Sequence, residues 1–132
     1  MALEVDILGM PKVILIDDDE MLLEMYRVKF VQKGCEVFTA LDGEQGLALI
    51  KEKKPNLIIL DILMPIVDGI TVLKQLRQEA PEIASIPVVV LSNFDAPDTK
   101  KEALELGAKD YVLKSNFTPD QLYDKVKDYL AK

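Results

Sequence analysis

The stretch KVILIDDDEML, residues 12–22, places four consecutive apolar residues directly before three aspartates. A short, continuously apolar run such as residues 13–16 is typical of a strand buried on both faces of a parallel sheet. The carboxylates of Asp17, Asp18 and Asp19 repel one another, which is unfavourable unless a positive charge lies near them. We therefore expect a buried strand that ends in a site for a positively charged group.

Four further apolar runs follow, and segments with helical spacing separate them. The runs cover residues 37–39, 57–60, 88–91 and 111–113, and the segments between them centre on residues 23–30, 47–50, 70–76 and 103–106. A last segment has Leu122, Val126, Tyr129 and Leu130 on one helix face. Because short buried strands alternate with helices, the pattern predicts an α/β fold of the type (βα)₅, a five-stranded parallel sheet with helices on both faces.

The length of 132 residues fits one globular domain, which we assign to residues 12–132. Residues 1–11 lie outside the pattern and are interpreted as an N-terminal extension. This segment carries Glu4 and Asp6 and no basic residue, which argues against a secretory signal. Because no apolar run approaches the roughly 20 residues that span a bilayer, we expect a cytoplasmic protein.

Charge and residue types disfavour several classes of function. The net charge of −7 argues against binding of this domain to nucleic acid, which depends on Lys and Arg, and against binding to a membrane surface. The chain has no histidine and a single cysteine, Cys35, which we interpret as a small buried hydrophobe. These counts exclude Ser-His and Cys-His nucleophiles and disfavour a zinc site. Any metal is therefore expected to be a hard cation bound by oxygen.

Polar side chains end four of the five predicted strands. Asp61 follows the third strand, Ser92 the fourth and Lys114 the fifth, while Asp19 and Asp68 are interpreted as helix caps. Ligands bind at the carboxyl ends of strands in open α/β sheets, so these groups are expected to converge with the first aspartates. A few carboxylates suit Mg²⁺, which can hold a phosphoryl group and screen its charge. An aspartate can then be the nucleophile and form an acyl phosphate.

Four motifs together point to one family. ILIDDDE, PNLIILDILMPIVDG, IPVVVLSNF and GAKDYVLKS occur in a familiar order and spacing. They resemble the response-regulator receiver domain of two-component signalling, as in chemotaxis regulators, over residues 12–130. The resemblance, and not the pattern, implies a flavodoxin-like, doubly wound sheet with strand order 2-1-3-4-5. It also implies a phospho-acceptor that assists its own phosphorylation and dephosphorylation, and not an enzyme that acts on other substrates.

The resemblance assigns roles to the residues at the strand ends. Asp61 is the residue that is phosphorylated. Asp18 binds Mg²⁺ directly, and Asp17 acts mostly through a metal-bound water. Asp61 and the backbone carbonyl of Leu63 supply further metal ligands. Lys114 pairs with Asp61 and later with the phosphoryl group.

The resemblance also implies a switch and partners. Ser92 is the hydroxyl that hydrogen-bonds a phosphoryl oxygen, and Tyr111 is the ring that turns inward when this hydroxyl moves. The output surface is the fourth helix, fifth strand and fifth helix, residues 97–130, which binds a downstream protein target. Because the chain has no histidine, the phosphohistidine donor is a separate sensor histidine kinase or phosphotransfer protein. The domain is expected to be a monomer or a phosphorylation-dependent dimer.

Two positions depart from the family pattern. Members usually have a cis proline after the lysine, where this chain has Ser115. A cis bond before a residue other than proline costs about 2.5–4 kcal/mol, so we expect a trans bond between Lys114 and Ser115. Asn93 is larger than the residue that usually follows the switch hydroxyl. With Phe94 and Leu63, it is expected to limit access of water and to slow hydrolysis of the acyl phosphate.

Other functions remain open from the sequence. A haloacid-dehalogenase-type phosphatase also uses Mg²⁺ and an aspartyl phosphate, and its Asp-x-Asp motif can be read in Asp17 and Asp19. It would be phosphorylated on Asp17, and Met21 stands where that family has Thr or Val. A receiver-like scaffold that does not signal through phosphate is the other alternative. The departure at Ser115 keeps it open, whereas the intact polar residues at the strand ends argue against it. A flavin-binding flavodoxin is disfavoured because the first loop is acidic.

Overall fold

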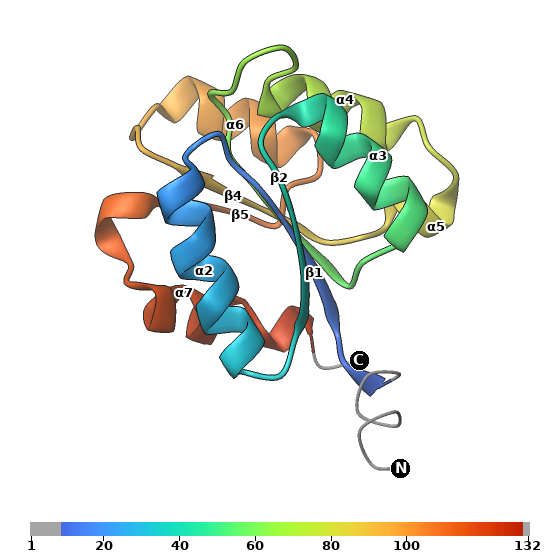
Figure 1. Ribbon diagram of the computed structural model, residues 1–132. Coiled ribbons are helices and arrows are strands. Elements are labelled where there is room, and N and C mark those ends of the chain that lie inside the picture. The colour runs from blue at the N-terminus through green and yellow to red at the C-terminus, as the bar shows by residue number, and fades with distance from the viewer. Residues whose placement is uncertain (1–8, 131–132) are drawn as a thin grey trace.

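The computed structural model describes residues 9–130 and contains a five-stranded parallel sheet (Figure 1). The strands are β1 (Lys12–Ile16), β2 (Glu36–Ala40), β3 (Leu57–Leu60), β4 (Val88–Ser92) and β5 (Asp110–Leu113). Their order in the sheet is β2-β1-β3-β4-β5, and every neighbouring pair is parallel. The predicted α/β class, the five strands and the strand order are therefore confirmed.

Helices cover both faces of the sheet (Figure 1). One face carries α2 (Glu20–Gln32) and α7 (Pro119–Val126), and the other carries α3 (Gly43–Lys53), α4 (Gly69–Arg77) and α6 (Pro97–Glu105). Successive strand residues point to opposite faces. In β1, Leu15 therefore packs with α2 and α7, whereas Ile14 packs with α3 and α4. Because both faces are covered, the strands are continuously apolar rather than alternating.

Three details of the helices differ from the sequence pattern. A single turn, α5 (Pro81–Ala84), precedes β4; it buries only Ile83, so it leaves no periodic signal. In α6 only Ala103 is buried, and Leu104 is exposed because the next helical position turns away from the sheet. The last α-helix ends at Val126 and continues as a 3₁₀ turn, Lys127–Tyr129, which is common at helix ends. Leu130 still lies in the core.

Most of the predicted N-terminal extension, residues 1–11, lies outside the described residues. Gly9, Met10 and Pro11 precede the first strand. Within residues 9–130, each helix is too short or too polar to cross a membrane.

The register of the strands brings the ends of β1 and β3 together. Ile16 pairs with Leu60, so Asp17 and Asp61 follow paired residues on neighbouring strands. The backbone N–H of Asp61 donates to the carbonyl of Ile16 at 2.9 Å. The positions of both aspartates are therefore set by the hydrogen bonding of the sheet and not by loops.

Gly69, at the start of α4, lies against the backbone at the end of β3. Its N–H donates to the carbonyl of Ile62 at 2.8 Å, and Asp68 caps the helix by accepting from the N–H of Thr71 at 2.9 Å. The interpretation of Asp68 as a cap is thus confirmed. A β-carbon at Gly69 would overlap the carbonyl oxygen of Asp61 and the Cα of Ile62. Both are backbone atoms that no rotamer change can move, so this position fits glycine alone.

We expect Gly69→Ala to lower the free energy of unfolding by about 3 kcal/mol, the upper part of the usual range for overpacking. Gly34→Ala is the matched control, because Gly34 has a φ of +93° but open space around its β-carbon position. Backbone strain alone should cost that variant about 1 kcal/mol. Urea unfolding of the two variants measures the difference. Equal losses would show that the collision at Gly69 is relieved at little cost.

Candidate metal centre at the carboxyl edge of the sheet

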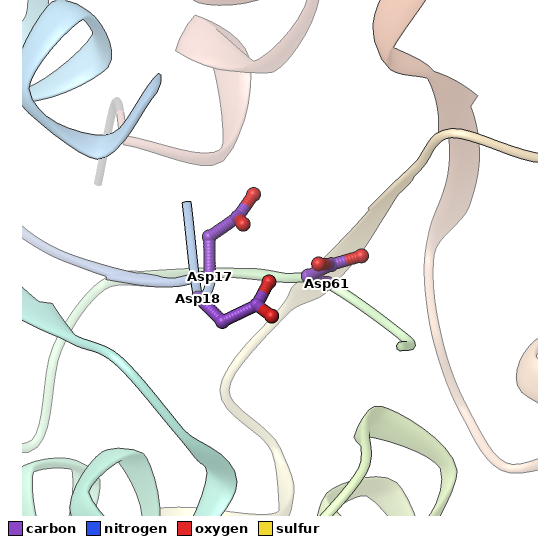
Figure 2. A group of neighbouring side chains, drawn as sticks. All are labelled: Asp17, Asp18 and Asp61. Atoms are coloured by element: carbon purple, nitrogen blue, oxygen red, sulfur yellow. The ribbon is translucent and has the colours of Figure 1, made fainter. Parts of the chain in front are cut away.

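Three carboxylates meet where β1 and β3 end. Asp17 and Asp18 follow β1, Asp61 follows β3, and one ligand oxygen from each lies within 4.8 Å of the others. Figure 2 shows Asp17 and Asp18 leaving the chain in different directions, with Asp61 beside them. Asp17 and Asp61 are buried, whereas Asp18 is exposed. Carboxylate oxygens crowded in this way are typical ligands of a hard divalent cation such as Mg²⁺.

Lys114 bridges the two buried carboxylates. Its Nζ lies 2.6 Å from Oδ2 of Asp17 and 3.5 Å from Oδ2 of Asp61. The resemblance implied a pair with Asp61; the structure shows that contact and a shorter one with Asp17. All three side chains are nearly inaccessible to solvent, so the interaction is far stronger than a surface ion pair.

The alternation of strand residues explains why these three side chains meet. Leu15, Ile59 and Val112 pack on the face of the sheet that carries α2 and α7. Asp17, Asp61 and Lys114 come two residues after Leu15, Ile59 and Val112, respectively. Because side chains two residues apart in a strand share a face, all three point toward the same face of the sheet.

Lys114 offsets only part of the negative charge of Asp17 and Asp61. Burial raises the pKa of Asp61 to about 6, and the negative charge of Asp17 adds to this rise against the opposing effect of Lys114. Burial would lower the pKa of Lys114, but its hydrogen bond to Asp17 and the charges of both carboxylates outweigh this and raise the pKa. Lys114 therefore stays protonated, and the three carboxylates leave an excess of negative charge that a cation would balance.

The aspartates after β1 have different surroundings. Asp19 caps α2 by accepting from the N–H of Leu22 at 3.2 Å, which confirms its interpretation as a helix cap. The N–H of Asp19 donates to Oδ1 of Asp17 at 3.0 Å. Asp17 is therefore held at Oδ1 by a backbone amide and at Oδ2 by Lys114. Asp18 keeps its carboxylate free for solvent or a ligand.

Leu63 lies in the loop between β3 and α4, and its side chain is exposed. Within the described part of the chain, no donor forms a hydrogen bond with its backbone carbonyl. The predicted role of this carbonyl as a metal ligand stays a prediction. The residues present fit the oxygen coordination that Mg²⁺ prefers.

Ser92 and Tyr111 share one hydrogen-bond partner, the backbone of Phe94. Oγ of Ser92 accepts from the N–H of Phe94 at 3.1 Å, and the hydroxyl of Tyr111 donates to its carbonyl at 3.0 Å. Tyr111 is buried against the α3, α4 and α6 side of the sheet. The two side chains are therefore linked to each other through the backbone of Phe94.

The loop after β5 keeps Lys114 in reach without a cis bond. The peptide bond between Lys114 and Ser115 is trans, as predicted, and residues Lys114–Asn116 form a 3₁₀ turn.

Cys35 is a buried free cysteine, as expected for a small core residue. The helical spacing of residues 23–30 indicates only that Tyr26 is a core position, but in the structure Tyr26 also lines a small cavity with Asp17 and Asp61. Helical spacing detects burial, but it does not show what a hydroxyl group faces.

Comparisons with known proteins agree on one family. The profile of the response regulator receiver domain family matches residues 13–127 of this chain. The transcriptional regulatory protein PhoP of alkaline phosphatase synthesis in Bacillus subtilis is 37% identical over 121 residues, 92% of this chain and 49% of PhoP. The transcriptional regulator RpaA of Synechocystis is 33% identical over 93% of this chain and 50% of its own length. This chain thus spans about half the length of the curated relatives it matches.

Solved structures show the same likeness. The receiver domain of the Francisella response regulator 1452 is 35% identical, with a TM-score of 0.81 over 92% of this chain and 97% of that chain. The chemotaxis protein CheY4 of Vibrio cholerae is 29% identical, with a TM-score of 0.84 over 92% of this chain and 99% of that chain. The matched profile, the relatives and the strand order together show that this chain belongs to the response regulator receiver domain family of two-component systems.

Proposed function

We propose that Asp61 accepts a phosphoryl group from a phosphohistidine on a separate sensor histidine kinase or phosphotransfer protein, in a reaction that depends on Mg²⁺. The observation that carries the proposal is the ammonium of Lys114 between Asp17 and Asp61, with Asp18 beside them. This arrangement offers a nucleophile, ligands for a cation and a fixed positive charge at one place. Phosphoryl transfer depends mainly on such positioning and charge stabilisation.

In the proposed transfer, one carboxylate oxygen of Asp61 attacks the phosphorus in line with the bond to the imidazole nitrogen of the donor. The new O–P bond forms as the N–P bond breaks, and the electron pair leaves with the imidazole. With a pKa of about 6, Asp61 is largely ionised at neutral pH and can act as the nucleophile. The three carboxylates and the Leu63 carbonyl would hold Mg²⁺, which would supply positive charge to the phosphoryl oxygens. Lys114 keeps one end of the site positive during transfer.

A rim of exposed apolar side chains supports a protein as the donor. Met21, Leu63, Ile66 and Phe94 are 79%, 57%, 76% and 54% exposed, and all lie at the carboxyl edge of the sheet. Exposed apolar groups around a polar centre are typical of protein–protein contacts. A small phosphate donor would not require them.

The proposed switch involves the hydrogen bonds between the backbone of Phe94 and the hydroxyl groups of Ser92 and Tyr111. To donate to a phosphoryl oxygen on Asp61, the hydroxyl of Ser92 must give up its long hydrogen bond to the carbonyl of Phe94, at 3.4 Å. This change moves the loop that leads into α6, while Tyr111 holds the Phe94 carbonyl from the other side. A local electrostatic event can in this way alter the surface of residues 97–130, formed by α6, β5 and α7. We propose that a downstream protein target recognises this surface.

We assign the receiver domain to residues 12–132, with residues 1–11 as an extension, in a cytoplasmic protein. The domain acts on itself and assists its own phosphorylation and dephosphorylation. It acts as a monomer or as a phosphorylation-dependent dimer. With a net charge of −7, this domain itself is not expected to contact nucleic acid or a membrane.

Incubation with Mg²⁺ and a small acyl-phosphate donor should add one phosphoryl group to the parent and none to Asp61→Ala, as read by intact mass. Asp95→Ala, which removes an exposed carboxylate in a nearby loop, is the matched control and should gain the group. Chelation of the metal should suppress the gain. Labelling lost in Asp17→Ala but kept in Asp61→Ala would favour the phosphatase alternative. No gain under any donor or metal condition would favour the scaffold.

Asp61→Asn should raise the free energy of unfolding of the metal-free protein by roughly 2 kcal/mol at neutral pH, because burial and Asp17 oppose the charge on Asp61. The folded chain holds this proton more tightly than the unfolded chain, whose carboxyl has its ordinary pKa of 3.8. The stability of the parent should therefore fall as pH rises from about 4 to about 6 and then level off. Urea unfolding in a chelator should show this slope in the parent and a shallower slope in the variant.

Urea unfolding of the parent and Asp61→Asn is then repeated with Mg²⁺ in place of the chelator. Added Mg²⁺ should stabilise the parent more than Asp61→Asn, because the ion binds the folded state through these carboxylates. Asp95→Asn serves as the control for a lost exposed charge. An Asp61→Asn variant that is less stable than the parent in chelator would contradict the electrostatic account.

Asn93→Ala should shorten the lifetime of the acyl phosphate by about threefold to tenfold, at most about 1.4 kcal/mol of barrier. Asn93 and Phe94 follow Ser92 and are exposed, and in this proposal they limit the access of water to the acyl phosphate on Asp61. Ser85→Ala, at an exposed position before β4, is a distant control. Loss of the phosphoryl mass with time in Mg²⁺ gives the lifetime. A lifetime in Asn93→Ala at least as long as in the parent would show that Asn93 does not restrict water.

A further inference from the structure

A buried tyrosine lies beneath the carboxylates. Tyr26, in the second turn of α2, is only 3% exposed. It is seven residues after Asp19, the cap of this helix, so the two share one face of the helix, roughly 10 Å apart along its axis. Long helical side chains point back toward the N-terminus. The phenol ring of Tyr26 therefore extends from the core toward the acidic end of α2.

A small, partly open cavity is lined by Tyr26 and by residues of the site. It has a volume of about 10 Å³, and its walls include Tyr26 and Leu23 from α2 and the two buried acids, Asp17 and Asp61. The remaining walls are apolar side chains of β1, β3 and β4. A space of this size holds about one water molecule, provided that two to four polar groups face it. Three of its lining residues, Tyr26, Asp17 and Asp61, carry polar groups that can bind such a water.

The charges around Tyr26 keep its hydroxyl in the form that donates. Burial raises the pKa of Tyr26 to about 12, and the negative charges of Asp17 and Asp19 add to the rise. The phenol is therefore protonated at any physiological pH. The hydroxyl of Tyr26 can therefore act as a hydrogen-bond donor near the carboxylates of Asp17 and Asp19.

We propose that Tyr26 is a positioning residue for the metal site: its hydroxyl donates, through one water held in this cavity, to the carboxylate of Asp17. Asp17 already receives the N–H of Asp19 at Oδ1 and Lys114 at Oδ2. A further donor from below fixes the rotation of the carboxylate and so the direction of its lone pairs toward a cation. This inference rests on the proposed function, because it assumes that Asp17 takes part in Mg²⁺ binding.

The effect expected is on metal affinity and not on the fold. Groups that orient a metal ligand typically change affinity about 10–100-fold when they are lost, and a contact through water lies at the lower end. Tyr26→Phe keeps the ring in the core and removes only the hydroxyl. Tyr123→Phe is the matched control, because Tyr123 lies on α7, where its ring packs edge-on against Phe30 at 5.5 Å.

Calorimetric titration with Mg²⁺ tests the proposal in the full chain. The Kd of Tyr26→Phe should rise about fivefold to tenfold, while Tyr123→Phe should match the parent. Urea unfolding in chelator should show no loss of stability in Tyr26→Phe, which separates positioning from a structural role. A Kd within twofold of the parent would overturn the inference but leave the proposed function intact. A parent that binds no Mg²⁺ would overturn both.

A second measurement does not depend on any variant. A high-resolution crystal structure of the parent with Mg²⁺ should show one ordered water within hydrogen-bond distance of both Oη of Tyr26 and the carboxylate of Asp17. A dry cavity, or a tyrosine hydroxyl bonded elsewhere, would overturn the inference while the phospho-acceptor role could still hold.

Discussion

The ion pair of Lys114 with Asp17 and Asp61 is the interaction on which the rest of the site depends. Two buried carboxylates on neighbouring strands repel each other, and burial alone opposes their charged forms. The ammonium, at 2.6 Å and 3.5 Å, makes the arrangement possible but does not balance it, since the pKa of Asp61 remains near 6. The excess negative charge that destabilises the metal-free fold is the same charge that attracts a cation. Stability and ligand binding are therefore linked through one set of groups.

The alternation of strand residues divides the site between the two faces of the sheet. The acids and Lys114 continue the pattern of the side packed by α2 and α7, whereas Tyr111 belongs to the side packed by α3, α4 and α6. Of the helices in the proposed output surface, α7 lies on the side of Asp61 and α6 lies on the other side. Ser92 ends β4, and its hydroxyl accepts from the N–H of Phe94 in the loop that leads to α6. Under the proposed function, this loop is the connection between Asp61 and α6.

The sequence predicts the fold and the meeting of the acids well for a definite physical reason. Continuously apolar runs are a strong signal of buried parallel strands, and parallel strands with short crossovers end at one edge, so Asp17 and Asp61 had to converge. Other features leave no such signal. The turn α5 buries a single residue, and the hydroxyl of Ser92 can bond within its own loop as readily as across the site. Tyr26 follows the helical period like any core residue, and only the folded chain shows that it lines a cavity with Asp17.

The loop after Asp61 is anchored by backbone hydrogen bonds at both ends and carries exposed apolar side chains between them. At one end, the N–H of Asp61 is bonded to β1, and at the other, the N–H of Gly69 is bonded to Ile62 with no space for a β-carbon. Between these anchors, Ile66 has a φ of 70°, a left-handed conformation that is unfavourable for a β-branched residue, and its side chain faces solvent. Strain held at an exposed position can be released without disturbing the core. The strained residue therefore lies in the exposed part of the loop, while the hydrogen bonds of the sheet hold the backbone of Asp61 in place.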